Sequence, residues 1–421
     1  MKWKPSSAAL FTFVLSCLAM SQQVTAIRAG HLIDPATGKV TDNRVIVIKE
    51  GKVESAGGSV PAGAQVIDLS KQWVMPGLMD AHTHITMDIP PAPPDVSSWE
   101  AVQAKESTAF RALRGLHQAE DILHSGFTTI RDVGNAGNYA DTALRQALEK
   151  GWFVGPTIIN AGKIIANFGG QSHGVSPEQG RMWNFEYLDA DNPAEIRKAI
   201  HQDIYYGAKV IKLVADNEGF VYTEEDIRAA ADEAHKAGLK LAVHVFGGQA
   251  ATNVIEGGAD SVEHGFGLTD EQLQLMKQKG TYLAGTDFPY EHLAAFGGIL
   301  PGFDLRKTAD QIQDRLSRAY KIGVRMAFST DDIANLPGKN RGQMSMDFLD
   351  IWTKAGIPAP AILKAMTTNC AELLGIEKER GAIAAGQYAD IIATTANPLQ
   401  DIQALRNVTF VMKEGRVVKQ K

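Results

Sequence analysis

The chain has 421 residues, of which 44% are hydrophobic and 21% charged, an ordinary composition for a globular protein. This length suggests one domain of about 250 to 300 residues and a smaller one. The net charge of −6 is spread along the chain and argues against a nucleic-acid partner or an anionic membrane surface.

The first 26 residues are typical of a signal peptide. Lys2 and Lys4 give a basic start, residues 8–20 form an apolar run, and Ala26 ends a small-residue cleavage site. The apolar run is too short to span a bilayer as a stable helix, so we expect no membrane span. The sequence therefore predicts an exported protein, periplasmic or secreted, that loses residues 1–26. A buried N-terminal helix is the alternative.

A lipoprotein signal through Cys17 is a second alternative, which Leu15 fits poorly. Cleavage of the signal peptide after Ala26 would remove Cys17 and leave Cys370 without a partner for a structural disulfide. We therefore expect that disulfides do not hold the exported protein together.

Short runs of alternating apolar and polar residues, separated by Gly and Pro, occur at both ends of the mature chain. They are residues 44–48, 51–53 and 64–68 near the N-terminus and residues 389–393, 408–412 and 415–418 near the C-terminus. Such runs are typical of antiparallel strands. We predict a small β-sandwich domain built from both termini, residues 27–73 and 376–421.

Between these ends, residues 74–375 alternate apolar strands with helical stretches. The eight strand candidates are residues 73–85, 128–133, 157–165, 210–215, 239–245, 260–264, 282–286 and 325–330. Helical periodicity lies between most of them, for example at residues 99–124, 194–206, 223–237 and 309–322. Eight βα units predict an α/β fold with a closed (β/α)8 barrel. A doubly wound open sheet is the alternative.

Histidine, lysine and aspartate side chains lie on five of these strands, at or near their C-terminal ends. They are His82 and His84 on the first strand, Lys212 on the fourth, His244 on the fifth, His264 on the sixth and Asp331 on the eighth. The C-terminal strand ends of such a barrel converge on one mouth, and residues two apart on a strand share a face. Imidazole suits zinc and its neighbours in the transition series. The pattern predicts a metal site, although each residue alone is also typical of a hydrogen-bonded structural side chain.

Lys212 is the unusual member, since it lies in an otherwise apolar strand. An ammonium group beside metal cations would be both repelled and desolvated. The lysine could serve there if its amine reacted with CO2 to give an anionic carbamate that bridges two metals. The alternative is a lysine paired with a buried carboxylate.

Several motifs of this chain, taken together, are typical of one superfamily. They are the segments Pro76–His84, Val210–Lys212, Tyr222–Glu225, Ser329–Asp331, Thr367–Gly375 and Gly386–Asp390, together with His244 and His264. In these motifs the sequence resembles the amidohydrolase superfamily, and within it the prolidase-like and imidazolonepropionase-related metal hydrolases. Ochratoxinase-like amidohydrolases are similar. The resemblance covers nearly all of the mature chain.

The resemblance implies a site with two divalent metal ions, usually zinc. His82, His84 and Asp331 would hold one ion, His244 and His264 the other, and Lys212, carboxylated by CO2, would bridge them. The metals would generate a bridging hydroxide. Asp331 would be the catalytic residue, which accepts the proton of the water and passes it to the leaving amine.

The chain departs from many relatives in the turn after Lys212. They carry a Gly-rich turn there, whereas this chain has Ala215-Asp216-Asn217-Glu218-Gly219. All six metal ligands remain. Asp216 and Glu218 are therefore expected to alter contacts with the substrate.

The implied activity is hydrolysis of an amide or peptide bond in a small molecule or dipeptide. The substrates would be dipeptides of the Xaa-Pro or Xaa-Arg type, or N-acyl amino acids, including ochratoxin-like aromatic amides. A cyclic-amide or lactone hydrolase using the same site is the alternative, and a catalytically silent barrel scaffold is the least favoured interpretation. Relatives often form homo-oligomers.

Three loop residues are candidates for substrate binding: His173, Tyr222 and Arg341. Tyr222 is similar to a tyrosine that contacts a substrate carboxylate in prolidase-like relatives, and a loop arginine could grip the same group. Each is also typical of a solvated loop residue. By contrast, we expect His292 to be solvated and Glu263 to face away from the site, on the opposite side of its strand from His264.

Overall fold

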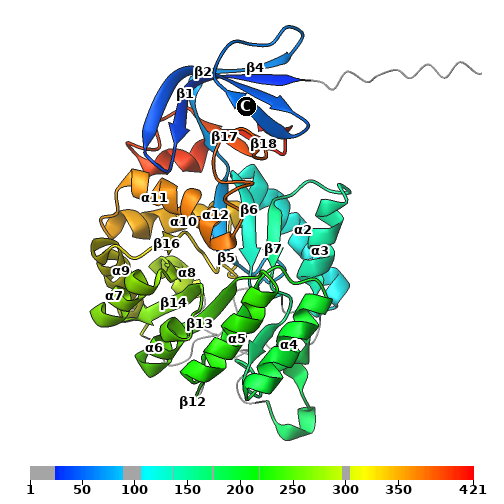
Figure 1. Ribbon diagram of the computed structural model, residues 1–421, viewed down its shortest axis with the longest axis vertical. Helices are drawn as coiled ribbons and strands as arrows, with labels where there is room; N and C mark the ends of the chain where they lie inside the picture. The colour runs from blue at the N-terminus through cyan, green and yellow to red at the C-terminus, as the bar shows by residue number, and fades with distance from the viewer. Residues whose placement is uncertain (1–23, 89–105, 136, 173–174, 218, 296–303) are drawn as a thin grey trace, which may run out of the picture.

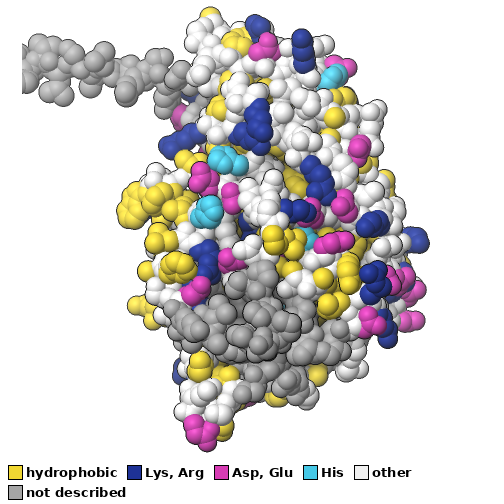
Figure 2. All heavy atoms as spheres, turned by 180° about the vertical axis from the view of Figure 1, so that it is seen from behind, with side chains coloured by type: hydrophobic (Ala, Val, Ile, Leu, Met, Phe, Trp, Pro, Cys, Tyr) yellow, Lys and Arg dark blue, Asp and Glu magenta, His cyan; other side chains and the backbone are white. Residues whose placement is uncertain are grey.

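The computed structural model describes residues 24–88, 106–135, 137–172, 175–217, 219–295 and 304–421. Strands from both ends of the chain form a β-domain, and the centre of the chain forms a barrel of strands surrounded by helices (Figure 1). Figure 2 shows basic and acidic side chains interspersed over one face, in keeping with charge that is spread along the sequence.

A seven-stranded sheet joins the two ends of the chain in the order β19-β18-β17-β4-β1-β2-β3. Its strands are β1 (Thr25–Asp34), β2 (Lys39–Lys49), β3 (Lys52–Ala56), β4 (Gln65–Pro76), β17 (Ile391–Thr394), β18 (Val408–Lys413) and β19 (Arg416–Gln420). The antiparallel pairing of β4 with β17 links the two halves, and Ile27, Ile67 and Phe410 meet in one buried cluster. The predicted β-domain from both termini is confirmed, whereas its boundaries at residues 73 and 376 stay predictions.

The barrel strands follow one another in chain order and pair in parallel. They are β5 (Leu78–Thr83), β6 (Phe127–Asp132), β7 (Thr157–Asn160), β8 (Ile164–Ala166), β10 (Ile211–Val214), β13 (Leu241–Gly247), β14 (Ser261–Gly267), β15 (Tyr282–Ala284) and β16 (Met326–Ala327).

Backbone hydrogen bonds close the barrel between its first and last strands. Ala81 N donates to Phe328 O at 2.8 Å, and Asp331 N donates to His82 O at 2.7 Å. Lys209 N donates to Asn160 O at 2.7 Å and so connects β7 with the chain before β10. The predicted (β/α)8 barrel is confirmed.

Helices cover the outside of the barrel (Figure 1). They are α2 (Thr108–His124), α3 (Ala140–Glu149), α4 (Pro193–Tyr205), α5 (Glu224–Lys236), α6 (Gly248–Glu256), α7 (Asp270–Lys279), α8 (Tyr290–Ala295), α9 (Leu305–Ile322), α10 (Arg341–Lys354), α11 (Ala359–Ala365) and α12 (Thr368–Leu374). Short elements complete the chain: β9 (Tyr187–Asp189), β11 (Asp216–Asn217), β12 (Phe220–Val221) and the 3-10 helices η1 (Pro177–Gln179), η2 (Met182–Phe185) and η3 (Ile402–Asn407). Among the described helices, none is both long and apolar enough to cross a membrane.

Local sequence signals fix the ends of several helices. Thr223, Thr269 and Asn340 begin α5, α7 and α10 with capping boxes, in which the cap side chain and the third helical residue satisfy each other's backbone N–H. Gly323 ends α9 in the left-handed conformation that glycine adopts without steric cost. The three capping boxes begin helices that follow barrel strands, whereas Gly323 ends a helix that leads into β16.

The predicted first strand, residues 73–85, is two strands in the structure. Pro76 ends β4 of the sheet and Leu78 begins β5 of the barrel. Gly77 between them packs so tightly against Thr128 that any side chain at this position would collide with it. The apolar run is continuous in sequence, so it does not reveal where the chain passes from one sheet to the other.

The predicted third strand, residues 157–165, is also divided, into β7 and β8. The break includes Gly162, whose φ of +76° lies in the left-handed region. The two pieces pair with different neighbours, β7 with β6 and β8 with β10.

Candidate metal centre

The six residues singled out in the sequence come from five strand ends of the barrel. His82 lies near the C-terminal end of β5, and His84 comes directly after that strand. Lys212 lies in β10, His244 in β13 and His264 in β14, and Asp331 follows β16. We refer to these six as the metal centre.

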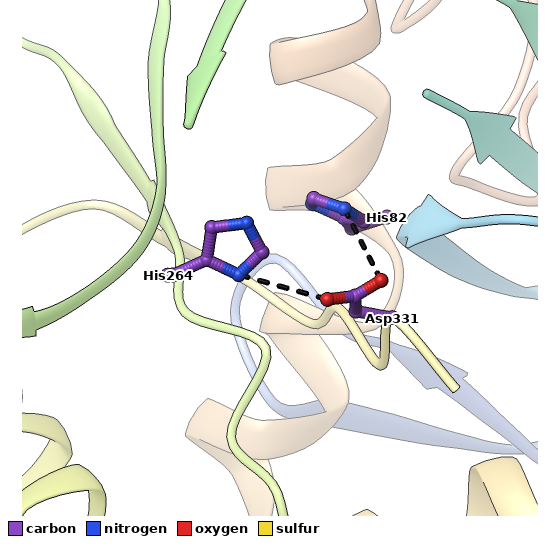
Figure 3. A group of neighbouring side chains, drawn as sticks. All are labelled: His82, His264 and Asp331. Atoms are coloured by element: carbon purple, nitrogen blue, oxygen red, sulfur yellow. Dashed lines mark ion pairs between the residues drawn. The ribbon is translucent and has the colours of Figure 1, made fainter. Parts of the chain in front are cut away.

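Asp331 lies between two of the histidines. Figure 3 shows His82, His264 and Asp331 pointing toward one another. The Asp331 carboxylate places Oδ1 3.6 Å from His82 Nε2 and Oδ2 3.7 Å from His264 Nδ1. One ligand atom from each of the three residues falls within 4.8 Å of the others, a spacing that a metal ion could bridge.

His84 and His244 extend this group on either side. His84 Nε2 is 3.3 Å from His82 Nε2 and 3.1 Å from Asp331 Oδ1. The His244 ring lies edge-on to the His264 ring, with centroids 4.4 Å apart. The structure therefore brings together all four predicted histidine ligands and the predicted carboxylate ligand.

Three of the imidazoles have one ring nitrogen engaged by the protein, which leaves the other for a ligand. His82 Nδ1 lies 2.6 Å from Glu263 Oε2, and His84 Nδ1 lies 2.8 Å from the Gly134 carbonyl oxygen. Both oxygens only accept, so both Nδ1 atoms carry the proton and both Nε2 atoms keep a lone pair. His264 Nδ1 is held at 2.8 Å by Thr286 Oγ1.

His244 is held through its other nitrogen. Its Nε2 lies 3.4 Å from Gln171 Nε2 and 3.7 Å from Asp216 Oδ1, so Nδ1 is the atom left for a ligand. An imidazole with one nitrogen fixed by an outer partner is the arrangement found at metal sites in proteins.

Burial favours the neutral form of three of these histidines, His82, His244 and His264. Desolvation, followed by the charge of Lys212, lowers the pKa of His82 and of His244 well below the usual value. Desolvation, followed by the neighbouring His244, does the same for His264. Neutral imidazole is the form that binds a metal, so this set of donors fits a divalent ion.

Lys212 is only 2% exposed. Within the described residues its ammonium group has neither an ion pair nor a hydrogen bond. Burial lowers its pKa to about 8, although Glu263 and Asp331 act in the opposite direction. A buried amine without a fixed partner is suited to reaction with CO2, and among the described residues no carboxylate forms an ion pair with Lys212.

Glu263 faces the metal centre, and our expectation that it faces away is wrong. Its carboxylate is buried. Oε2 accepts from His82 Nδ1, and Oε1 accepts from Arg131 Nη2 at 2.7 Å. His264, the next residue, has a φ of +67°, which interrupts the regular alternation of β14. A signal for this contact was present in the sequence, because Arg131 lies in an apolar barrel strand and a buried cation requires a buried anion.

Asp80 ties the first strand to the last. Its Oδ1 accepts from His82 N at 3.0 Å and from Thr330 N at 3.1 Å, and its Oδ2 accepts from Thr330 Oγ1 at 2.7 Å. Because Thr330 precedes Asp331, this carboxylate fixes the separation between two predicted ligands. Burial raises the pKa of Asp80 to about 7.

The sequence pattern of the amidohydrolase family matches residues 73–418, a range that contains the whole metal centre. The chain belongs to the amidohydrolase family. It is a hydrolase that acts on C–N bonds.

Relatives of this amidohydrolase include enzymes with several substrates. Ochratoxinase from Aspergillus niger is 28% identical over 433 aligned residues, which cover 94% of this chain and 87% of that protein. An imidazolonepropionase from Kosmotoga olearia is 23% identical, with 90% of this chain and 91% of that protein covered. The crystal structure of an Xaa-Pro dipeptidase with bound methionine in the active site is 30% identical, with a TM-score of 0.81, and covers 94% of this chain and 100% of that one.

The predicted substrate-binding residues of this amidohydrolase are not brought together as the predicted metal ligands are. The Tyr222 side chain is fully buried and its hydroxyl donates to the Ala190 carbonyl oxygen. The Arg341 guanidinium is also buried and donates to the carbonyl oxygens of Asp332 and Met87. His173 and Glu218 lie outside the described residues. A substrate contact for each of these residues stays a prediction.

Arg341 instead holds the loop that carries Asp331, since it binds the backbone of the next residue. His292 acts on the same loop, and our expectation that it is solvated is wrong. It is 1% exposed and lies between two carboxylates, with Nδ1 3.3 Å from Asp332 Oδ1 and Nε2 3.3 Å from Asp347 Oδ2.

Replacing Glu263 by Gln is expected to weaken zinc binding by about 10- to 100-fold, the usual cost of losing an outer partner of a metal ligand. The amide cannot supply the negative charge that orients His82 and balances Arg131. Zinc affinity is measured by competition with a chromophoric chelator. Glu256→Gln, which removes a surface ion pair with Lys279, is the matched control. Equal affinity of Glu263→Gln and wild type would exclude this role.

The stability of the enzyme is expected to fall as the pH rises through about 9 because of His292. Burial alone would lower the pKa of His292, but its hydrogen bonds to Asp332 and Asp347 raise it to about 9. The unfolded chain has an ordinary histidine pKa of about 6.5. The stabilisation, on the order of 3 kcal/mol, is therefore complete below about pH 6.5 and is lost as the pH rises through 9. Urea unfolding of wild type and His292→Gln at pH 6.5 and 9.5 tests this, and parallel losses in the two proteins would contradict it.

Proposed function

We propose that this amidohydrolase is a metal-dependent peptidase of small substrates, which releases the C-terminal amino acid from a dipeptide or an N-acyl amino acid. The observation that carries the proposal is the convergence on one barrel mouth of four histidines, Asp331 and a buried lysine that has no ion pair among the described residues. The similarity of this chain to an Xaa-Pro dipeptidase and to an ochratoxinase supports an amide substrate the size of a dipeptide or an N-acyl amino acid.

We assign His82, His84 and Asp331 to one divalent ion, and His244 and His264 to a second. Lys212 would bridge the two ions as a carbamate. Zinc suits a donor set of imidazole nitrogens and carboxylate oxygens. When bound, two such ions supply an ionised water near neutral pH and polarise the scissile carbonyl.

Asp331 is the proposed proton carrier. Its carboxylate borders three of the histidines, and its side chain is 15% exposed, more than those of His82, His84 and His264. It can therefore accept a proton from the attacking water and release it to the nitrogen of the leaving amine. The hydrogen bonds of Asp80 and Arg341 hold the backbone on either side of it.

Two measurements test the proposal. Metal analysis of the protein as purified with zinc is expected to give about two ions per chain, whereas a value near zero would support a silent scaffold. A substrate screen should then cover Xaa-Pro and Xaa-Arg dipeptides, N-acyl amino acids and an ochratoxin-like aromatic amide. Hydrolysis of none of these by the zinc-loaded enzyme would overturn the proposed activity.

A cyclic-amide hydrolase is the second candidate, and the similarity to an imidazolonepropionase supports it. The same donor set would serve it, because ring opening also needs an attacking water and a proton for the leaving nitrogen. Cyclic amides and lactones belong in the same screen, and a higher kcat/KM for these than for any dipeptide would favour this candidate.

We further propose that the protein is exported. The first described strand, β1, begins at Thr25 and so overlaps the last two residues of the predicted signal peptide. Cleavage after Ala26 would remove two residues that pair with β2 and β4, so the mass of the mature protein is the informative measurement. Recovery of the full-length chain from the cytoplasm would contradict export.

A further inference from the structure

A second carboxylate, that of Asp216, lies at the edge of the metal centre beside His244. Asp216 begins the short strand β11 in the turn after Lys212, where this chain differs from the Gly-rich turn of many relatives. Its Oδ2 accepts from Phe246 N at 3.0 Å, and its Oδ1 lies 3.7 Å from His244 Nε2. The backbone of β13 thus holds the carboxylate against the ring of a predicted ligand.

Among the described residues, no basic side chain balances the negative charge of Asp216. No lysine or arginine among the described residues forms an ion pair with it, and Oδ1 is a buried oxygen without a hydrogen-bond partner. The side chain as a whole is 21% exposed. A largely buried carboxylate with one unsatisfied oxygen is costly unless a cation pairs with it.

Three other carboxylates at the site already have partners or lie among the histidines. Glu263 binds His82 and Arg131, Asp80 binds His82 and Thr330, and Asp331 lies among the histidines. Compared with these three, Asp216 has an oxygen without a hydrogen-bond partner and so has capacity left for a group brought by the substrate.

Aromatic rings lie beside His244, the histidine that Asp216 contacts. The Phe246 side chain is 36% exposed, and its ring centroid is 4.7 Å from that of His244 and 5.4 Å from that of Phe266. The face of an aromatic ring attracts cations. A carboxylate and an exposed aromatic ring that both border His244 are together suited to an ammonium group.

We propose that Asp216 and Phe246 bind the α-ammonium group of a dipeptide, so that the enzyme selects substrates with a free N-terminus over N-acyl amino acids. This inference rests on the proposed function and narrows its substrate class. The scissile carbonyl carbon must lie beside His244, His264 and Asp331, and the α-amino nitrogen is one carbon further along the substrate. A carboxylate that binds this nitrogen must therefore border the same cluster, as Asp216 does.

The test compares matched substrates that differ only in the charge of this nitrogen. The pairs are Met-Pro, Ala-Arg and Ala-Phe, each with its Nα-acetyl counterpart. For wild type we expect kcat/KM to be at least about tenfold higher for the free dipeptides, the effect of one charged pairing of about 1.4 kcal/mol. In Asp216→Asn the KM for free dipeptides should rise by a similar factor with kcat largely kept, while the values for the acetylated forms stay unchanged.

Two further variants sharpen the result. Phe246→Leu should raise KM for the free dipeptides alone, because it keeps an apolar side chain and removes the aromatic face. Asp232→Asn, at an exposed position on α5, is the control and should change neither member of a pair. Zinc content should equal that of wild type in all three variants.

Three results would overturn the inference. An equal loss on both members of each pair in Asp216→Asn would show that Asp216 only positions His244. Loss of zinc from that variant would make Asp216 a metal ligand. A wild-type preference for the acetylated forms would exclude an ammonium subsite.

Binding measurements separate this inference from the proposed function. Calorimetric titration of the zinc-loaded protein with L-methionine and with N-acetyl-L-methionine does not require turnover. Tighter binding of L-methionine that is lost in Asp216→Asn supports the subsite even if no substrate of the screen is cleaved. Equal binding of the two compounds by wild type overturns it.

Discussion

Asp331→Asn is expected to keep its fold and its zinc while losing about 100- to 10,000-fold in kcat, the range that a positioned acid–base group contributes. An amide cannot take the proton of the attacking water or return it to the leaving amine. Its oxygen can still occupy the position of Oδ1 near His82 and His84. The measurement is kcat for the best substrate of the screen, together with zinc content and thermal unfolding.

The backbone of Asp331 makes asparagine the appropriate replacement. Its φ is +54°, in the left-handed region that asparagine and aspartate tolerate better than most residues. Asp331→Ala would add backbone strain to the loss of the carboxylate. If Asp331→Asn retains more than about a tenth of the wild-type kcat, well above the range expected for such a group, Asp331 is not the proton carrier.

Lys212→Ala is expected to reduce the zinc content from about two ions to one or fewer and to abolish turnover. The carbamate proposed at this position would be the one anionic ligand shared by both ions, so its removal weakens both sites. Alanine also removes a buried amine that has no partner among the described residues, so the loss of metal should not be accompanied by a broken ion pair.

Added carboxylic acids separate loss of the carbamate from a general disturbance of β10. Acetate or propionate can occupy the space of the missing side chain and supply an anionic oxygen ligand, so it should restore part of the zinc content and of kcat. Lys209→Ala, at an exposed position just before β10, is the matched control and should behave as wild type. Full zinc content in Lys212→Ala without added acid would contradict a bridging role.

The barrel and its six central residues could be predicted from the sequence because their signals are local. Each of His82, His244, His264 and Asp331 ends an apolar run, and the closed barrel brings such ends together without any knowledge of side-chain contacts. The β-domain could be predicted for a similar reason, since alternating runs at both ends of the chain need a common core.

The partners of these residues could not be predicted because they are distant in sequence and depend on local backbone conformation. Glu263 contacts His82 across 181 positions, and it can do so because His264 departs from regular strand geometry. His292 lies in a short helix whose sequence is compatible with solvent exposure, and it is buried by the packing of α8 against the loop after β16 and against α10. Tyr222 was assigned by similarity, and its position in the core depends on Ala190, 32 residues away.

The passage of the chain through Gly77 joins the two domains more closely than a linker would. A single residue separates the strand that pairs with β1 and β17 from the strand that carries His82. Trimming the protein to an isolated barrel would therefore leave the first ligand-bearing strand unanchored at its start. The terminal sheet is best regarded as part of the scaffold of the catalytic machinery, and engineering of a smaller enzyme should keep it.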